Sequence, residues 1–313
     1  MQRRSLVIGS ALSASGLAGW CATYGAMAGS RGPELPEQDV CVSRPVESRP
    51  VGTRLPEDLS FAGTRLFKEG FLDELAQAYT RHTDRRVHVL GGGCDDGIAA
   101  VRGMMAHVGG LCCPVHGSGA QGLDHLIVGH DVKAVLAHPS VPIDDLRWDD
   151  LRQLVAGRIT SWSQLGGPER PIPLVVHDHC PDYIEPARDL LLKNRPEWSR
   201  RALFAKTDQK HLDLLMRFDL SIGVNSWILA EPLVAAGKLK RLTIDGVQPG
   251  IDSVRSRRYR LTGPMNMIFR EWDAELMAPF FAFLYSEVGQ KILSRRMVPV
   301  SASVAGFPRL LRA

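Results

Sequence analysis

The chain has 313 residues, of which 44% are hydrophobic and 23% are charged, and its formal net charge is +4. These values are typical of a globular protein and exclude a disordered or fibrous chain. The small charge and the absence of a long basic run argue against a nucleic-acid-binding protein. The length suffices for two domains, or for one domain with two lobes.

The first 28 residues have the pattern of a secretory signal peptide. Arg3 and Arg4 precede an apolar stretch at residues 6–20, and Ala26 and Ala28 form an A-x-A cleavage site. The apolar stretch is too short to span a membrane. We therefore expect residues 1–28 to be removed on export to the periplasm. Residues 29–57 are rich in proline, glutamate, arginine and serine, and they are predicted to form an N-terminal arm.

Cleavage after Ala28 would remove Cys21 and leave five of the six cysteines. These five are Cys41, Cys94, Cys112, Cys113 and Cys180. In an oxidising compartment an odd number leaves at least one thiol unpaired. Neighbours such as Cys112 and Cys113 rarely bridge to each other, because the required geometry strains the peptide. The pairing of the cysteines stays open at this stage.

Short apolar strands alternate with helical segments along the rest of the chain. Strands are predicted at 59–63, 86–90, 132–136, 173–176, 221–224, 239–244 and 259–269. Helices are predicted at 67–79, 98–105, 151–159 and 184–193, and one long amphipathic helix at 274–294. This order predicts an α/β fold with a parallel sheet and ligand loops at the strand ends.

Two predicted glycine turns, at residues 91–97 and 109–114, carry cysteines. Glycine lets the backbone approach a small ligand and direct N–H groups at it. Cysteine adds a soft sulfur that can bind a thiophilic element. The alternative for any one of these cysteines is a buried structural thiol.

Several stretches in the same order resemble the periplasmic phosphate-binding proteins of ABC transporters, the PstS-like group. The strongest match is residues 151–167, which resemble a run L-x-x-I-F-x-G-K-I-T-x-W-x-x-L-G-G. Further matches are residues 171–175, 221–223, 245–247 with 259–261, 286–290 and 298–300. The resemblance implies a type II periplasmic binding protein with two α/β lobes, two hinge strands and a ligand cleft between the lobes. Lobe 1 is expected to comprise residues 58–137 plus 255–313, and lobe 2 residues 138–254.

The loops that hold the ligand in that group differ in this sequence. Thr64 and Arg65 keep the expected hydroxyl at the start of a helix and are candidate ligand-binding residues; the alternative for Thr64 is a plain helix cap. The other three loops, which are rich in hydroxyl groups in the family, contain cysteine and aspartate here. Their candidate ligand-binding residues are Cys94, Asp95, Cys112, Cys113, Asp178 and Cys180.

Each of these candidates has a structural alternative. Asp95 and its neighbour Asp96 suit the first turn of a helix as caps. Cys94 suits either a ligand donor or a disulfide to the loop of Cys112, and Cys180 suits a bridge to Cys41. His177 is expected to be an exposed loop histidine.

These substitutions disfavour a dianion, because thiols are weak donors and the added carboxylates repel it. We therefore expect arsenite, which is neutral and exchanges hydroxyls for sulfur, as the ligand, held through Cys112 or Cys113. The arsenite-sensing relatives of the family imply a membrane histidine kinase as the partner. The alternatives are a phosphate or oxyanion component of an ABC transporter, with a permease as partner, and a periplasmic copper-binding protein. We expect no cofactor and no enzymatic activity, because no nucleophile elbow, C-x-x-C or zincin motif is present.

Overall fold

The computed structural model describes residues 58–177, 186–193 and 198–306. The predicted signal peptide, the N-terminal arm, Cys41, Asp178 and Cys180 lie outside these residues. Among the described residues, no helix combines the length and the apolar character needed to cross a membrane.

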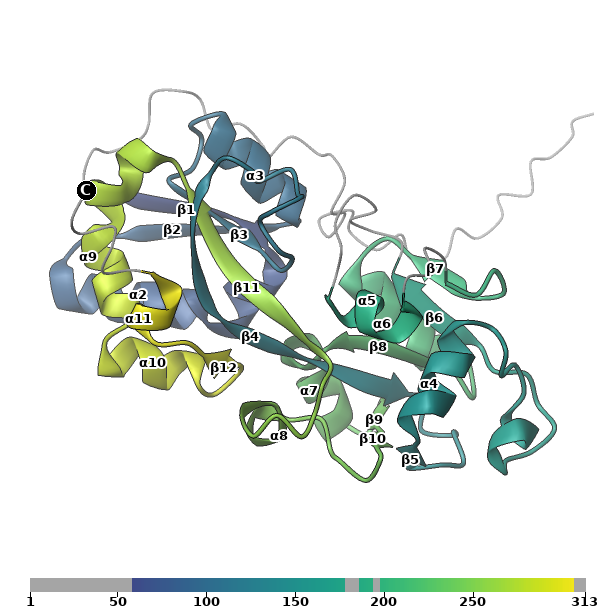
Figure 1. Cartoon of the computed structure of the whole chain (residues 1–313). Helices are drawn as coiled ribbons and strands as arrows, with labels where there is room; N and C mark the ends of the chain where they lie inside the picture. The colour runs from purple at the N-terminus through teal and green to yellow at the C-terminus, as the bar shows by residue number, and fades with distance from the viewer. Residues whose placement is uncertain (1–57, 178–185, 194–197, 307–313) are drawn as a thin grey trace, which may run out of the picture. The chain divides into compact units, whose positions relative to one another are not determined.

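One sheet connects most of the strands, in the order β2-β1-β3-β11-β4-β8-β6-β7 (Figure 1). Its first part consists of β1 (Leu59–Thr64), β2 (Val87–Gly92) and β3 (Val108–Leu111). These three strands are parallel, with β1 in the middle. Their connections are helical: α1 (Arg65–Phe67), a π-helical turn (Lys68–Leu72), α2 (Asp73–Thr83) and α3 (Cys94–Arg102). The predicted parallel strand–loop–helix arrangement is therefore confirmed for this part.

Two long antiparallel strands, β4 (Asp124–Ala137) and β11 (Thr262–Phe269), continue the sheet. Up to Val132, β4 pairs with β11, and from Lys133 onward it pairs with β8 (Ile222–Ser226). The predicted strand at 132–136 is thus the second half of a 14-residue strand. Its first half was missed because Asp124, His125, His130 and Asp131 interrupt the apolar pattern.

The second part of the sheet contains β8, β6 (Leu174–His177) and β7 (Leu203–Ala205), all parallel to one another. Its helices are α4 (Trp148–Val155), a 3-10 turn (Trp162–Leu165), α5 (Pro186–Leu192), α6 (Asp208–Arg217), α7 (Trp227–Ala235) and α8 (Ile251–Arg255). The short strands are β5 (Asp145–Leu146), β9 (Lys240–Arg241) and β10 (Thr243–Ile244). The tryptophan of the resemblance motif, Trp162, is fully buried and donates its ring N–H to the carbonyl of Leu220 at 3.0 Å.

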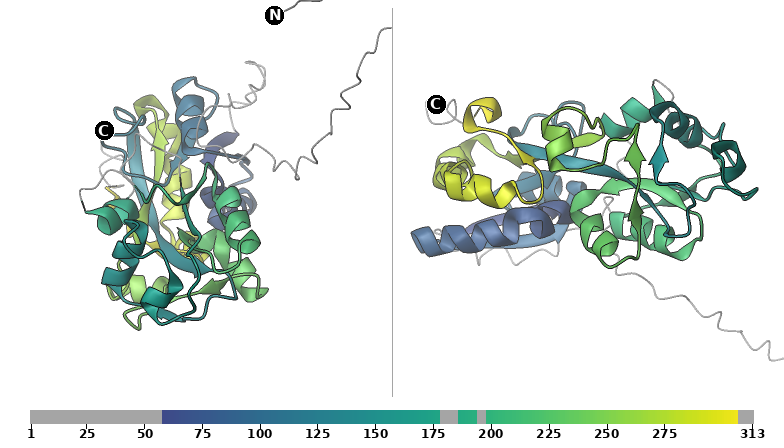
Figure 2. Two further views of the ribbon diagram at one scale, coloured as in Figure 1. Left: turned by 90° about the vertical axis from the view of Figure 1, so that its right-hand side faces the viewer. Right: turned by 90° about the horizontal axis from the view of Figure 1, so that it is seen from below.

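The C-terminal region returns to the first part of the sheet, as the yellow elements in Figure 2 show. It contains a 3-10 turn (Glu271–Asp273), α9 (Ala274–Leu284), α10 (Glu287–Leu293), β12 (Val298–Pro299) and α11 (Ala302–Ala305). The prediction of one helix over 274–294 is wrong. The hydroxyl of Ser286 accepts the backbone N–H of Gly289 at 3.3 Å and begins a new helix there.

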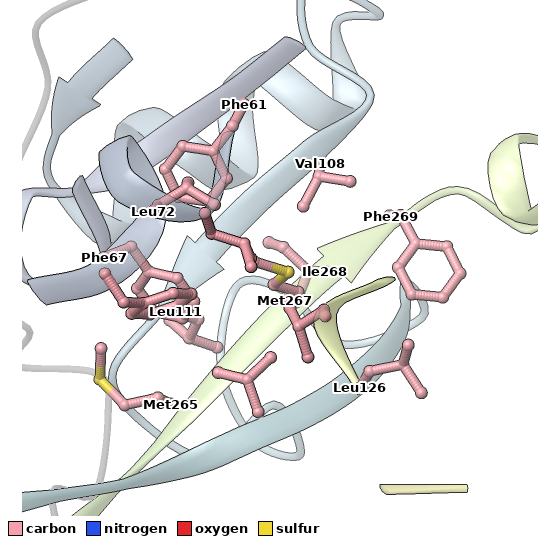
Figure 3. Packing of buried hydrophobic residues seen from close by; sticks show 14 of the residues in the cluster. Phe61, Phe67, Leu72, Val108, Leu111, Leu126, Met265, Met267, Ile268 and Phe269 are labelled. Atoms are coloured by element: carbon pink, nitrogen blue, oxygen red, sulfur yellow. The ribbon is translucent and has the colours of Figure 1, made fainter. Parts of the chain in front are cut away.

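Separate hydrophobic cores lie on the two parts of the sheet. The first combines residues from β1, α2, β3 and the C-terminal region; Figure 3 shows Phe61, Leu111, Met267 and Phe269 within it. The second contains Trp162, Leu174 and Tyr259 and draws on α4, β6 and the chain before β11. Residues 128 and 265 still belong to the first core, and residues 132 and 261 already belong to the second. The lobe boundaries given above stay a prediction.

Candidate functional site

The carboxyl ends of three parallel strands, β1, β2 and β3, lie at one edge of the sheet. Ligand-binding groups usually lie at this edge of a parallel sheet. Thr64, the last residue of β1, lies opposite Gly92, the last residue of β2. On the other side of β1, Gly63 lies opposite Gly110 of β3. Cys94 begins α3 just after β2, and Cys112 directly follows β3. Residues far apart in the sequence are therefore brought together at this edge.

Glycine makes this junction very compact. A side chain at Gly110 would meet the ring of Phe61 at 2.6 Å, and one at Gly97 would meet the carbonyl oxygen of Ala62 at 2.9 Å. Gly63 has a φ of +145°, which only glycine adopts without strain. The expectation of two glycine turns is wrong in detail, because Gly91 and Gly92 lie in β2 and the other pair, 109–110, lies in β3. There, glycine serves close packing between helix and strand.

The sulfur atoms of Cys94 and Cys112 lie 3.3 Å apart. The backbone N–H of Cys112 also points at the sulfur of Cys94, at 3.5 Å. Cys94 is fully buried, and Cys112 is 8% exposed. Of the candidates named from the sequence, the structure brings these two cysteines into direct contact.

Cys113 has a different environment. It is buried within the first hydrophobic core, and its carbonyl accepts a hydrogen bond from the Asn266 side chain on β11 at 2.8 Å. The backbone of Cys113 is thereby held against the neighbouring strand. Its role as a ligand donor stays a prediction.

One of the two acidic residues at the start of α3, Asp96, bonds the backbone at the start of the helix itself. The carboxylate of Asp96 accepts the backbone N–H of Gly93 at 2.7 Å. Burial raises the pKa of Asp96 above its ordinary value. A carboxylate at a helix N-terminus satisfies the same N–H groups that would otherwise attract an external anion. Asp95, next to it, is partly exposed.

Thr64 and Arg65 have local partners. The hydroxyl of Thr64, which is nearly buried, accepts the backbone N–H of Leu66 at 3.3 Å. The guanidinium of Arg65 forms an ion pair with Glu69 one helical turn later. The helix-capping alternative for Thr64 thus describes a contact that is present.

A buried ion pair that the sequence analysis missed lies on β4. The ammonium of Lys133 is 3.2 Å from Asp131, and the hydroxyl of Ser226 on β8 donates to the same carboxylate at 2.9 Å. Burial raises the pKa of Asp131 to about 6, although Lys133 and Ser226 act in the opposite direction and nearby Cys112 adds to the rise. The missed signal was two opposite charges, two residues apart, beside the apolar run 134–137; residues at this spacing in a strand share one face.

A second polar cluster lies where β6 ends. The imidazole of His177 stacks on that of His211, with ring centroids 4.2 Å apart, and contacts the carboxylate of Asp208 at 3.0 Å. The side-chain amide of Asn225 donates to His211 at 3.2 Å. The expectation that His177 is exposed is wrong, since only 15% of its side chain is exposed. Asp178 and Cys180, the candidates that follow it, lie outside the described residues.

Among the described residues, no group of three or more His, Cys, Asp or Glu side chains is arranged to hold a metal ion.

Comparison with known proteins identifies the fold. Residues 47–178 match the model of the PBP superfamily domain. A phosphate-binding protein whose structure from Clostridium perfringens contains bound phosphate is 20% identical and superimposes with a TM-score of 0.67. That superposition covers 78% of this chain and all of the other. The chain has the two-lobed fold of the periplasmic binding proteins. An ABC-type phosphate transport receptor from Vibrio cholerae, 21% identical, shares this fold with a TM-score of 0.58 over 77% of this chain and all of that chain.

Two curated relatives carry the same name, phosphate-binding protein PstS. The one from Bacillus subtilis is 23% identical over 250 residues, which cover 78% of this chain and 81% of that protein. The one from Borreliella burgdorferi is 20% identical over 183 residues, or 56% of this chain, and the match spans only 65% of that protein's length. Both names are those of binding proteins, in agreement with the expectation that this chain is not an enzyme.

Proposed function

We propose that this protein is a periplasmic solute-binding protein for a small oxyanion, which it delivers to an ABC permease. The observation that carries the proposal is the fold shared with phosphate-binding proteins, in which β1, β2 and β3 lie side by side and end at one edge of the sheet. In an open α/β sheet the ligand binds at this edge. Because the relatives are named for phosphate, phosphate is the first ligand to test.

Arsenite is the second candidate, and the contact between Cys94 and Cys112 favours it. Two sulfur atoms 3.3 Å apart offer a thiophilic centre two donors from one side. Asp96, which occupies the start of α3, disfavours a dianion there, whereas a neutral hydroxylated ligand meets no charge repulsion. In this case a membrane histidine kinase would be the partner.

Isothermal titration calorimetry with phosphate, arsenate, sulfate and arsenite distinguishes the two candidates. Binding of phosphate or arsenate with no effect of Cys94→Ser or Cys112→Ser would support the transporter proposal. Binding of arsenite that is lost in both serine variants and kept in Cys113→Ser would support the sensor instead. Cys113→Ser is the comparison variant, because it changes a neighbouring buried cysteine outside the sulfur pair; loss of arsenite binding in this variant alone would make Cys113 the donor. Failure of all four ligands to bind would overturn both candidates.

A further inference from the structure

The distance between Cys94 and Cys112 suits a second kind of chemistry. A disulfide bond is about 2.05 Å long, so the two sulfurs, 3.3 Å apart, need to approach by only roughly 1 Å to form one. The two sulfur atoms are in contact, and the backbone N–H of Cys112 donates to the sulfur of Cys94 as well. Closing the bond therefore requires side-chain rotation and little backbone movement.

The surrounding backbone keeps the two thiols at this distance. Cys94 is the first residue of α3, and Cys112 follows the last residue of β3. That helix and that strand are packed together through glycine: a side chain at Gly109 would lie 2.9 Å from the carbonyl oxygen of Gly97. The approach of the sulfurs is thus set by two regular elements in direct contact.

The two cysteines also differ in access. Cys112 is 8% exposed and Cys94 is fully buried. Thiol–disulfide exchange starts at the thiol that the oxidant can reach, and a second thiol close by then resolves the mixed disulfide. The arrangement provides one cysteine for each step.

We propose that Cys94 and Cys112 are a redox-active dithiol, which closes to a disulfide by exchange with a low-molecular-weight disulfide or an oxidised dithiol protein. The thiolate of Cys112 attacks one sulfur of the oxidant, forms a mixed disulfide and releases the first thiol, which takes up the proton that Cys112 lost. The thiolate of Cys94 then attacks the sulfur of Cys112, and the second thiol leaves with the proton from Cys94. The two cysteines are oxidised, and one disulfide of the oxidant is reduced to two thiols.

This inference deepens the arsenite candidate of the proposed function, because the disulfide removes both sulfur donors from a thiophilic ligand. Thr64 and the backbone of the loops would keep their places. We therefore expect oxidation to abolish arsenite binding and to leave any phosphate binding within a factor of two.

The test is equilibration of the full mature chain with mixtures of reduced and oxidised glutathione, followed by acid quenching, alkylation and mass spectrometry. Wild-type protein should yield a linked pair of peptides containing Cys94 and Cys112. The pair should persist in Cys113→Ser and disappear in Cys94→Ser and Cys112→Ser. Repeating the experiment with Cys41 and Cys180 also replaced by serine leaves only the three described thiols to react.

Several results would overturn the proposal. These are full alkylation of Cys94 and Cys112 under oxidising conditions, a glutathione adduct on Cys112 that persists, or linkage of either cysteine to Cys41 or Cys180. Peptide mapping of wild type decides the matter even if a variant fails to fold. Peptide mapping uses no ligand. Failure of arsenite and phosphate to bind would therefore contradict the proposed function without contradicting the redox-active pair.

Discussion

The ammonium of Lys133 lies 3.2 Å from the carboxylate of Asp131, and both side chains are buried on β4. The pair sits where β4 changes its partner: Val132 is the last residue paired with β11, and Lys133 is the first paired with β8. Ser226 on β8 bonds the same carboxylate, and the hydroxyl of Tyr259 donates to the carbonyl of Lys133 at 2.9 Å. The buried ion pair and its hydrogen bonds thus lie at the point where β4 changes its pairing partner from β11 to β8.

The raised pKa of Asp131 predicts a pH-dependent stability. Its pKa rises from 3.8 in the unfolded chain to about 6 in the folded protein, so between these values the folded state binds more protons. The contribution of this carboxyl group to the free energy of unfolding should therefore fall as the pH rises from about 4 to about 6. Urea unfolding at several pH values measures the free energy of unfolding. Between about pH 4 and pH 6 this free energy should change less with pH in Asp131→Asn than in wild type.

The control for this measurement is Asp252→Asn, which changes a carboxylate that is 90% exposed on α8. Its pH dependence should match that of wild type. If the free energy of unfolding changed with pH equally in wild type and in Asp131→Asn, the raised pKa of Asp131 would be contradicted.

Removing one member of the buried pair should cost more than removing both charges. Lys133→Met leaves the Asp131 carboxylate buried without its counter-charge, which typically costs about 3–5 kcal/mol of stability. The combined change Asp131→Asn, Lys133→Met should cost clearly less, because no charge stays buried. Denaturant unfolding at neutral pH compares the two variants with wild type. A double variant less stable than Lys133→Met would show that the pair itself stabilises the fold.

The glycine junction predicts an intolerant position in α3. Gly97→Ala would place a methyl group 2.9 Å from the Ala62 carbonyl oxygen and 3.0 Å from Cα of Gly63, both rigid backbone atoms. Such overpacking typically costs about 1–3 kcal/mol. Gly250→Ala is the control, because its nearest neighbour would be the Ser253 hydroxyl at 3.9 Å. In thermal unfolding, the melting temperature should fall clearly for Gly97→Ala and only slightly for Gly250→Ala.

Removing the charge of Asp96, at the start of α3, should change the affinity for anions. Asp96→Asn removes the charge while an amide oxygen can still accept the Gly93 N–H, so phosphate should bind roughly tenfold more tightly, a gain of about 1.4 kcal/mol. The affinity for neutral arsenite should stay nearly constant. Calorimetry with both ligands measures the effect. Unchanged phosphate affinity would mean that Asp96 lies away from the ligand.

The sequence by itself determined the fold class and the edge of the sheet that carries the candidate site. Apolar runs such as 59–63 and 173–176 marked buried strands, and the ordered motifs around residues 151–167 resembled one family whose fold the comparisons support. The sequence placed Cys112 in a loop after a strand, as the structure does, whereas Cys94, also predicted in a loop, is the first residue of α3. Each of these inferences uses residues that are close together in the chain.

Only the tertiary structure decided which side chains meet. Cys94 contacts Cys112 because α3 packs on β3, and the backbone of Cys113 is bound by Asn266, a residue 153 positions away, because β11 pairs with β3. Ser226 reaches Asp131 across 95 residues for the same kind of reason. Sequence periodicity gives the face of a strand and the point where it ends. The order and register of strands in a sheet depend on the packing of the whole chain, and these two quantities determine the contacts of the site.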